Sequence, residues 1–262
     1  MLSYLIICLV AIIVSALTLF SGFGLGTLLM PAFALFFPLP VAIAATAVVH
    51  LANNIFKAIL VGKKADWHVV LRFALPGAAA AILGAWLLTL LSGIPAAFAY
   101  SIGTNKYEID IINLVIGSLI IIFAFLDILP RLQKLSFERK YLPLGGVLSG
   151  FFGGLSGIQG ALRSAFLIKA GLNKDAFIGT GTVSAVIVDI ARLLVYGISF
   201  YTLKFATIPK ETYGLIGAAI IAAFAGSFIG ARLVKKVTLR TIQIIVGAML
   251  ILVGFGMVSG LL

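Results

Sequence analysis

Six stretches of the chain are almost wholly apolar and about 20 residues long, the length that a helix needs to cross a hydrocarbon core about 30 Å thick. They are residues 41–62, 70–91, 110–129, 175–197, 213–234 and 241–260. Their apolar residues are continuous and do not alternate with polar ones, which favours spanning helices over barrel strands. Hydrophobic residues make up 62% of the chain and charged residues only 10%, a balance that excludes a soluble globular domain. The sequence therefore predicts an all-α polytopic membrane protein.

Two further apolar stretches do not fit this template, because glycines interrupt them. One contains SGFGLGTLLMPAFALFF from Ser21, and the other contains SGIQGALRSAFLIKAG from Ser156. Residues 2–38 are too long for one crossing, and 143–171 are interrupted by glycines 150, 153, 154, 157 and 160. Glycine costs about 1 kcal/mol relative to alanine inside a helix, so clustered glycines predict a break. We expect each stretch to form a hairpin. Its second arm, 24–37 or 158–171, extends roughly 21 Å at 1.5 Å per residue, which is short enough to be re-entrant.

The two halves of the chain repeat one another. Four matching pairs occur in the same order along both halves: Ser21 with Ser156, Thr46 with Thr180, Ala80 with Gly226, and Gly117 with Gly247. The pairs are 135, 134, 146 and 130 residues apart, and the differences are expected because connecting loops tolerate insertions. This order indicates a duplication, with residues 1–130 as the first repeat and 131–262 as the second, each a glycine-broken hairpin followed by three spanning helices.

Lysine and arginine indicate the orientation of the halves, since short cytoplasmic loops collect these residues. If each broken stretch enters and leaves on one side, thirteen basic residues face the cytoplasm: Lys63, Lys64, Arg72, Arg131, Lys134, Arg139, Lys140, Lys169, Lys174, Arg232, Lys235, Lys236 and Arg240. Only Lys106, Lys204 and Lys210 then face outside. A single crossing at 143–171 would instead place the Lys235 cluster outside. The charges therefore predict hairpins that open to opposite sides of a plasma or inner membrane, which makes the halves inverted repeats.

Four motifs carry a resemblance to a known family. They are GFGLGTLLMP from Gly22, GIQGALRSAF from Gly157, AATAVVHLANN from Ala44 and GTGTVSAV from Gly179. In this order they resemble the TauE/SafE family of sulfite and organosulfur exporters, over nearly the whole chain. The resemblance implies a transporter of small anions such as sulfite, sulfonates, sulfoacetate or related carboxylates, usually outward across the plasma membrane. The second hairpin departs from the family's glycine-rich pattern at Gln159 and Arg163, which we expect to set what this member carries.

The broken helices suggest where an anion would bind. Helix N-termini present free amide groups and a positive dipole end, so both breaks favour negative charge. Arg163 follows the second break and offers a planar guanidinium suited to oxyanions. The predicted substrate-binding residues are Gly22, Gly24, Gly26, Asn53, Asn54, Gly157, Gln159, Gly160 and Arg163. Two alternatives stay open: the glycines only permit close helix packing, and Arg163 holds backbone carbonyls of its hairpin.

A polar stripe within 41–62 is the second candidate feature. His50, Asn53, Asn54 and Lys57 stand at i, i+3, i+4 and i+7, which places them along one helix face. Such a stripe suggests a water-lined path, in which the asparagine amides donate to an oxyanion and His50 carries a coupled proton. Alternatively, the asparagines hold helices together and Lys57 extends past Gly62 to the membrane interface.

Asp189 and Arg192 lie three residues apart, so they can pair inside the membrane, either as a structural ion pair or as a proton-coupled gate. With His50 and Lys57 they form the predicted coupling or gating set. The chain has no nucleotide-binding loop and no HExxH or GxSxG motif, so we expect no enzyme activity and no cofactor or metal. An ion or substrate gradient then supplies the energy. An intramembrane enzyme and a non-transporting assembly subunit remain the alternative functions. The net charge of +11 reflects cytoplasmic loops and predicts no nucleic-acid partner.

Overall fold

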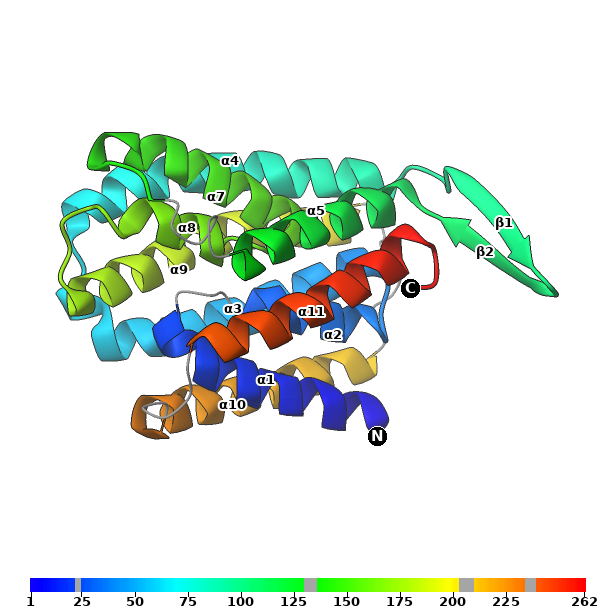
Figure 1. Ribbon diagram of the computed structural model, residues 1–262, viewed down its shortest axis with the longest axis horizontal. Coiled ribbons are helices and arrows are strands. Elements are labelled where there is room, and N and C mark those ends of the chain that lie inside the picture. Colours follow the sequence, from blue (N-terminus) through cyan, green and yellow to red (C-terminus); the bar gives the residue numbers. More distant parts are fainter. Residues whose placement is uncertain (22–24, 130–135, 203–209, 234–238) are drawn as a thin grey trace.

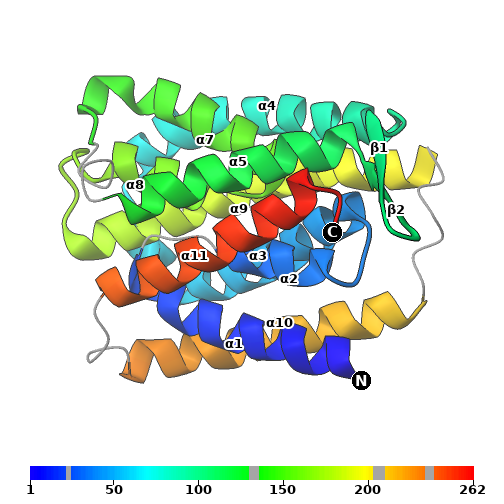
Figure 2. The same ribbon diagram turned by 45° about the vertical axis from the view of Figure 1, so that its right-hand side comes forward.

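The computed structural model describes residues 1–21, 25–129, 136–202, 210–233 and 239–262, which form a bundle of helices with one protruding β-hairpin (Figure 1). The first half contains α1 (Leu2–Ser21), α2 (Gly26–Ala34), α3 (Leu39–Val61), η1 (Gly62–Lys64), α4 (Trp67–Ser92), β1 (Phe98–Ile102), β2 (Asn105–Ile109) and α5 (Ile111–Ile128). The second half contains η2 (Arg139–Tyr141), α7 (Leu142–Ser156), α8 (Gly160–Leu167), α9 (Lys174–Thr202), α10 (Lys210–Leu233) and α11 (Leu239–Val258). The termini and the hairpin lie at one end of the bundle (Figures 1 and 2).

Each of the six predicted spanning stretches is occupied by a helix. Among the described residues, four segments are long and apolar enough to cross a membrane: Leu39–Lys64, Trp67–Ser92, Lys174–Ser199 and Thr212–Gly230. Shorter apolar stretches occur in α1, α5 and α11. The protein is therefore a multi-pass helical membrane protein.

Local sequence explains where the long helices of the first half begin. Pro38 lies in an extended conformation just before α3, and Pro40 occupies its first turn, where a missing amide hydrogen costs nothing. Asp66 caps α4 by accepting hydrogen bonds from the amides of His68, at 3.0 Å, and Val69, at 3.2 Å.

The connection between α4 and α5 adds one small β-hairpin to the helical bundle. Strands β1 and β2 are antiparallel, and Tyr100 lies opposite Tyr107, with ring centroids 5.3 Å apart. The short alternating pattern of this segment is weak beside the long apolar runs. Tyr100 also donates a hydrogen bond to the Ser259 carbonyl oxygen at 2.5 Å, which fixes the base of the hairpin to the end of α11.

The glycine-rich stretch 143–171 breaks at fewer places than predicted. Helix α7 continues through Gly150, Gly153 and Gly154, and it ends at Gly157, whose φ of +79° suits glycine alone. A Cβ atom placed on Gly150 would lie 2.0 Å from the Gly77 carbonyl oxygen of α4. The same atom on Gly154 would lie 2.2 Å from the carbonyl oxygen of Ala81. At these two positions the absence of a side chain allows the backbones of α4 and α7 to touch. Close packing therefore explains these two glycines, and a break in the helix does not.

The helices associate mainly in five pairs: α4 with α7, α1 with α10, α5 with α11, α4 with α9, and α3 with α9 (Figure 2). Small residues again bring backbones together in the α1–α10 pair, where Cβ atoms on Gly226 and Gly230 would lie 2.2 Å and 2.4 Å from carbonyl oxygens of α1. Without a hydrophobic drive between helices in lipid, such close contact supplies much of the association energy.

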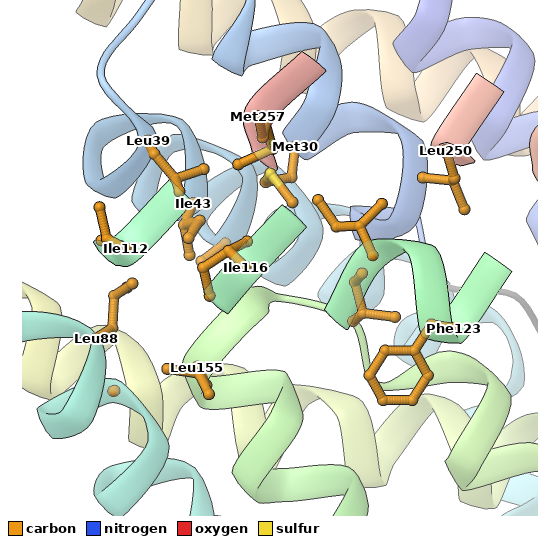
Figure 3. Close-up of a cluster of buried hydrophobic side chains, with 14 of the residues drawn as sticks. Met30, Leu39, Ile43, Leu88, Ile112, Ile116, Phe123, Leu155, Leu250 and Met257 are labelled. Atoms are coloured by element: carbon orange, nitrogen blue, oxygen red, sulfur yellow. The ribbon is translucent and has the colours of Figure 1, made fainter. Parts of the chain in front are cut away.

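The short helix α2 is held in place by an apolar cluster. Figure 3 shows Met30 of α2 directed toward Met257 of α11, with Ile43 of α3 and Ile116 of α5 beside them. All four side chains are buried. The cluster therefore fixes α2 against the long helices that surround the two breaks.

Replacing Gly154 with alanine should weaken the α4–α7 contact, because the new methyl group overlaps the Ala81 carbonyl oxygen. We expect a loss of about 1–3 kcal/mol in the free energy of unfolding, measured in detergent by chemical denaturation. Gly197→Ala is the matched control, since a Cβ atom there meets no neighbouring atom within 4 Å and alanine favours the helix. Equal stability of the two variants would contradict the packing role of Gly154.

Candidate anion site

The two glycine breaks meet in space. Gly26 begins α2, and a Cβ atom placed on it would lie 2.9 Å from the carbonyl oxygen of Gly157, which ends α7. The methyl group of Thr46 on α3 would lie 3.7 Å from the same atom. Gly22 and Gly24, also predicted to bind substrate, fall outside the described residues. Gly26 and Gly157 are far apart in the sequence but close in space. We take the point where they meet as the centre of the site.

Asp189 of α9 connects the polar residues around this centre. Its carboxylate is fully buried. His50 Nδ1 lies 2.6 Å from Oδ2, and Asn54 Nδ2 donates to the same oxygen at 3.3 Å. Gln159 Nε2 donates to Oδ1 at 3.0 Å, and Arg192 Nη2 lies 2.7 Å from Oδ1 as an ion pair. One carboxylate thus joins α3, α9 and the second break.

Arg192 also closes the end of the broken helix α7. Its Nη1 donates a hydrogen bond of 2.9 Å to the Gly153 carbonyl oxygen, and Tyr196 donates one to the carbonyl oxygen of Gly154. The last carbonyl groups of a helix lack partners within the helix, and no water satisfies them at membrane depth. Holding hairpin carbonyls was the alternative considered for Arg163, and Arg192 performs that task. Tyr196 was missed, although its position one turn after Arg192 was the available signal.

Arg163 has a different environment. It lies in the second turn of α8 and is 9% exposed, and its Nη1 has no hydrogen-bond partner among the described residues. Its charge is attracted by Asp189 and repelled by Arg192. The amides of Gly160 and the next two residues head α8, where a helix leaves its first N–H groups free. A guanidinium edge and a helix N-terminus therefore adjoin the same break, a combination suited to an oxyanion.

The predicted stripe on α3 divides into two parts. Asn54 faces Asp189, whereas the Oδ1 of Asn53 accepts hydrogen bonds from Ser15 Oγ of α1, at 3.2 Å, and from Ser227 Oγ of α10, at 2.8 Å. Asn53 thus ties three helices together, as in the alternative interpretation of this residue. The spacing in the sequence could not assign different partners to Asn53 and Asn54. Neighbouring residues on a helix point about 100° apart, and the spacing does not show which helices lie in each direction.

Lys57 lies inside the bundle and not on its surface. The residue is only 6% exposed, and among the described residues no side chain or carbonyl group forms a hydrogen bond or ion pair with it. The positive charge of Arg163 acts on Lys57. Two buried cations, neither with an ion-pair partner among the described residues, therefore lie near the Asp189 cluster.

Replacing Arg192 with methionine should leave Asp189 without its ion pair and α7 without part of its cap. Breaking a buried pair by removing one partner costs about 3–5 kcal/mol, so we expect a loss of this size in unfolding free energy in detergent. The double variant Asp189→Asn, Arg192→Met should recover part of the loss.

The exposed Lys64–Asp175 pair gives the control, since it joins α9 to η1 at the surface. Lys64→Met should cause no measurable loss, because exposed pairs contribute little. If Arg192→Met were no more destabilising than Lys64→Met, the proposed role of the buried pair would be wrong.

Comparison with known proteins identifies the family. Searches of curated proteins and of solved structures return no match. The family model described as sulfite exporter TauE/SafE matches residues 7–257, a range that contains both glycine breaks and the whole Asp189 cluster. The expected resemblance is thus confirmed, and the chain belongs to the TauE/SafE sulfite exporter family of membrane transporters.

Proposed function

We propose that this protein is a secondary transporter that exports a small oxyanion of the sulfite and sulfonate class across the plasma membrane. The observation that carries the proposal is the buried guanidinium of Arg163 beside the N-terminus of α8, whose Nη1 has no hydrogen-bond partner in the part of the chain that the structure describes. A buried cation without a partner is costly in a membrane unless a ligand completes it. Membership of the sulfite exporter family supports the class of anion.

The transport mechanism that we propose is alternating access between two inverted repeats, residues 1–130 and 131–262. Equivalent close contacts support the repeats. A Cβ atom on Gly84 of α4 would lie 2.1 Å from the Phe151 carbonyl oxygen of α7, and one on Gly230 of α10 would lie 2.4 Å from that of Ala16 on α1. These residues are related by the shifts of 146 and 135 found in the sequence. In each case the third long helix of one half packs on the first helix of the other.

Short helices at the breaks support re-entrant hairpins. Helix α2 has 9 residues and α8 has 8, so they extend about 14 Å and 12 Å at 1.5 Å per residue, less than half of a bilayer core. We infer that one hairpin enters from each side and that both end at mid-membrane, where Gly26 meets Gly157. Rocking of one repeat against the other would then expose the anion to each side in turn. The end that carries η1 and the clustered lysines is the cytoplasmic end in this proposal.

Proton movement is the proposed source of coupling. The site holds three side chains that can exchange a proton: His50, Lys57 and Asp189. Asp189 and His50 share a short contact of 2.6 Å, so a proton on either one is felt by both. We place each of these groups close to the proposed anion position. In this arrangement the movement of a proton is linked to the movement of the anion.

Replacing Arg163 with alanine should abolish most anion transport. Hydrogen bonds to a charged group contribute about 1.5–3 kcal/mol, so we expect the rate of sulfite movement in reconstituted vesicles to fall about tenfold or more at subsaturating sulfite. Arg163→Lys should retain an intermediate rate, because lysine keeps the charge but loses the planar fork.

Arg72→Ala serves as the control, since Arg72 is exposed on α4. It should transport at the wild-type rate, and both Arg163 variants should be shown to unfold at a temperature near that of the wild type. Wild-type transport rates in a folded Arg163→Ala variant would contradict the proposal.

A further inference from the structure

Lys57 is placed where its charge can respond to a bound anion. It stands one turn after Asn54 on α3, within reach of the electrostatic field of Arg163 on α8, and it is buried. None of the described residues supplies a counter-ion or a hydrogen bond to it. Two neighbouring cations without an anion are unfavourable at membrane depth.

The charges around the site do not balance without a ligand. The carboxylate of Asp189 is matched by Arg192, its ion-pair partner at 2.7 Å. Among the described ion pairs none includes Arg163 or Lys57, so these two positive charges remain unmatched there. A guanidinium keeps its proton under all ordinary conditions, whereas a buried lysine releases its proton readily. Of the two, Lys57 is the group whose charge can change.

The other titratable groups are less free to exchange a proton with the substrate. His50 of α3 and Asp189 and Arg192 of α9 are engaged with one another, and Lys63 and Lys64 of η1 are exposed. Lys57 makes none of these contacts, and the charge of Arg163 acts on it. Lys57 therefore lies outside the hydrogen-bonded Asp189 cluster and within the electrostatic influence of the proposed anion ligand.

Lys57 and Arg163 have no charged counterparts at the matching positions of the other half of the chain. The shift of 135 that relates the two breaks places Arg163 on Leu28, and the shift of 134 places Lys57 on Ala191. Neither equivalent position carries a charge. The pair is thus not a requirement of the common architecture, which supports a role in what the site binds.

We propose that Lys57 carries the coupling proton: its amine is uncharged in the empty site and takes up one proton from water when an oxyanion binds between Lys57 and Arg163. On release of the anion, the ammonium group returns that proton, so that anion and proton cross together. This inference rests on the proposed anion transport. It also specifies the cargo further, because a protonated Lys57 and Arg163 together match a doubly charged oxyanion.

Titration calorimetry of sulfite binding in detergent tests the proposal, in two buffers with different ionisation enthalpies and at a pH where free sulfite is already the dianion. The wild-type protein should take up about one proton per bound anion, as linkage requires for a group that becomes charged on binding. Lys57→Arg should bind sulfite with almost no proton uptake, because its charge is fixed. Lys57→Met should bind more weakly, also without uptake. Lys64→Met, which changes an exposed lysine near the end of the same segment, should leave uptake unchanged.

The outcomes separate the two proposals. Proton uptake that persists in Lys57→Arg and disappears in His50→Gln would assign the proton to the His50–Asp189 pair and overturn the inference. Sulfite binding without proton uptake in the wild type would also overturn it, while leaving anion transport intact. Absence of sulfite and sulfonate binding in the wild type would overturn the proposed function together with the inference.

Discussion

A carboxylate at membrane depth is tolerated only where other groups replace its lost hydration. Asp189 meets this condition by drawing donors from three places: His50 and Asn54 on α3, Arg192 on its own helix, and Gln159 in the second break. The same contacts fix the position of the break, because Gln159 lies in the break and Arg192 holds the end of α7. The arrangement of the centre therefore depends on one buried negative charge, which also positions Arg192.

The two halves of the chain are similar in how their helices pack but differ in their ionisable residues. Glycine and alanine bring helix backbones into contact in both halves, as at Gly84 and Gly230. The ionisable residues are distributed unequally, since the second half supplies Asp189 and both buried arginines while the first supplies His50 and Lys57. We infer that near-symmetric packing provides the two-sided framework for transport, and that the unequal charges give the framework its substrate.

The sequence was sufficient for the spanning helices, because continuous apolar runs have few alternative structures in a membrane. It also located both glycine breaks, although it could not separate glycines that end a helix from those that allow contact. Gly154 lies against the α4 backbone, which is far away in sequence, whereas Gly157 has a left-handed φ of +79°. For the same reason the directions of Asn53 and Asn54, and the cap provided by Tyr196, depend on neighbours that periodicity does not reveal. The β-hairpin was missed because two short strands give a weak pattern.

The central claim is that an oxyanion binds beside Arg163 at the meeting point of the two breaks. Anomalous diffraction from crystals soaked with selenite, the selenium analogue of sulfite, tests it most directly. We expect a selenium peak within hydrogen-bonding reach of the Arg163 guanidinium and the first amides of α8, and loss of that peak in Arg163→Ala crystals. A peak elsewhere in the bundle, or one at the same place that survives the substitution, would show that Arg163 does not hold the anion.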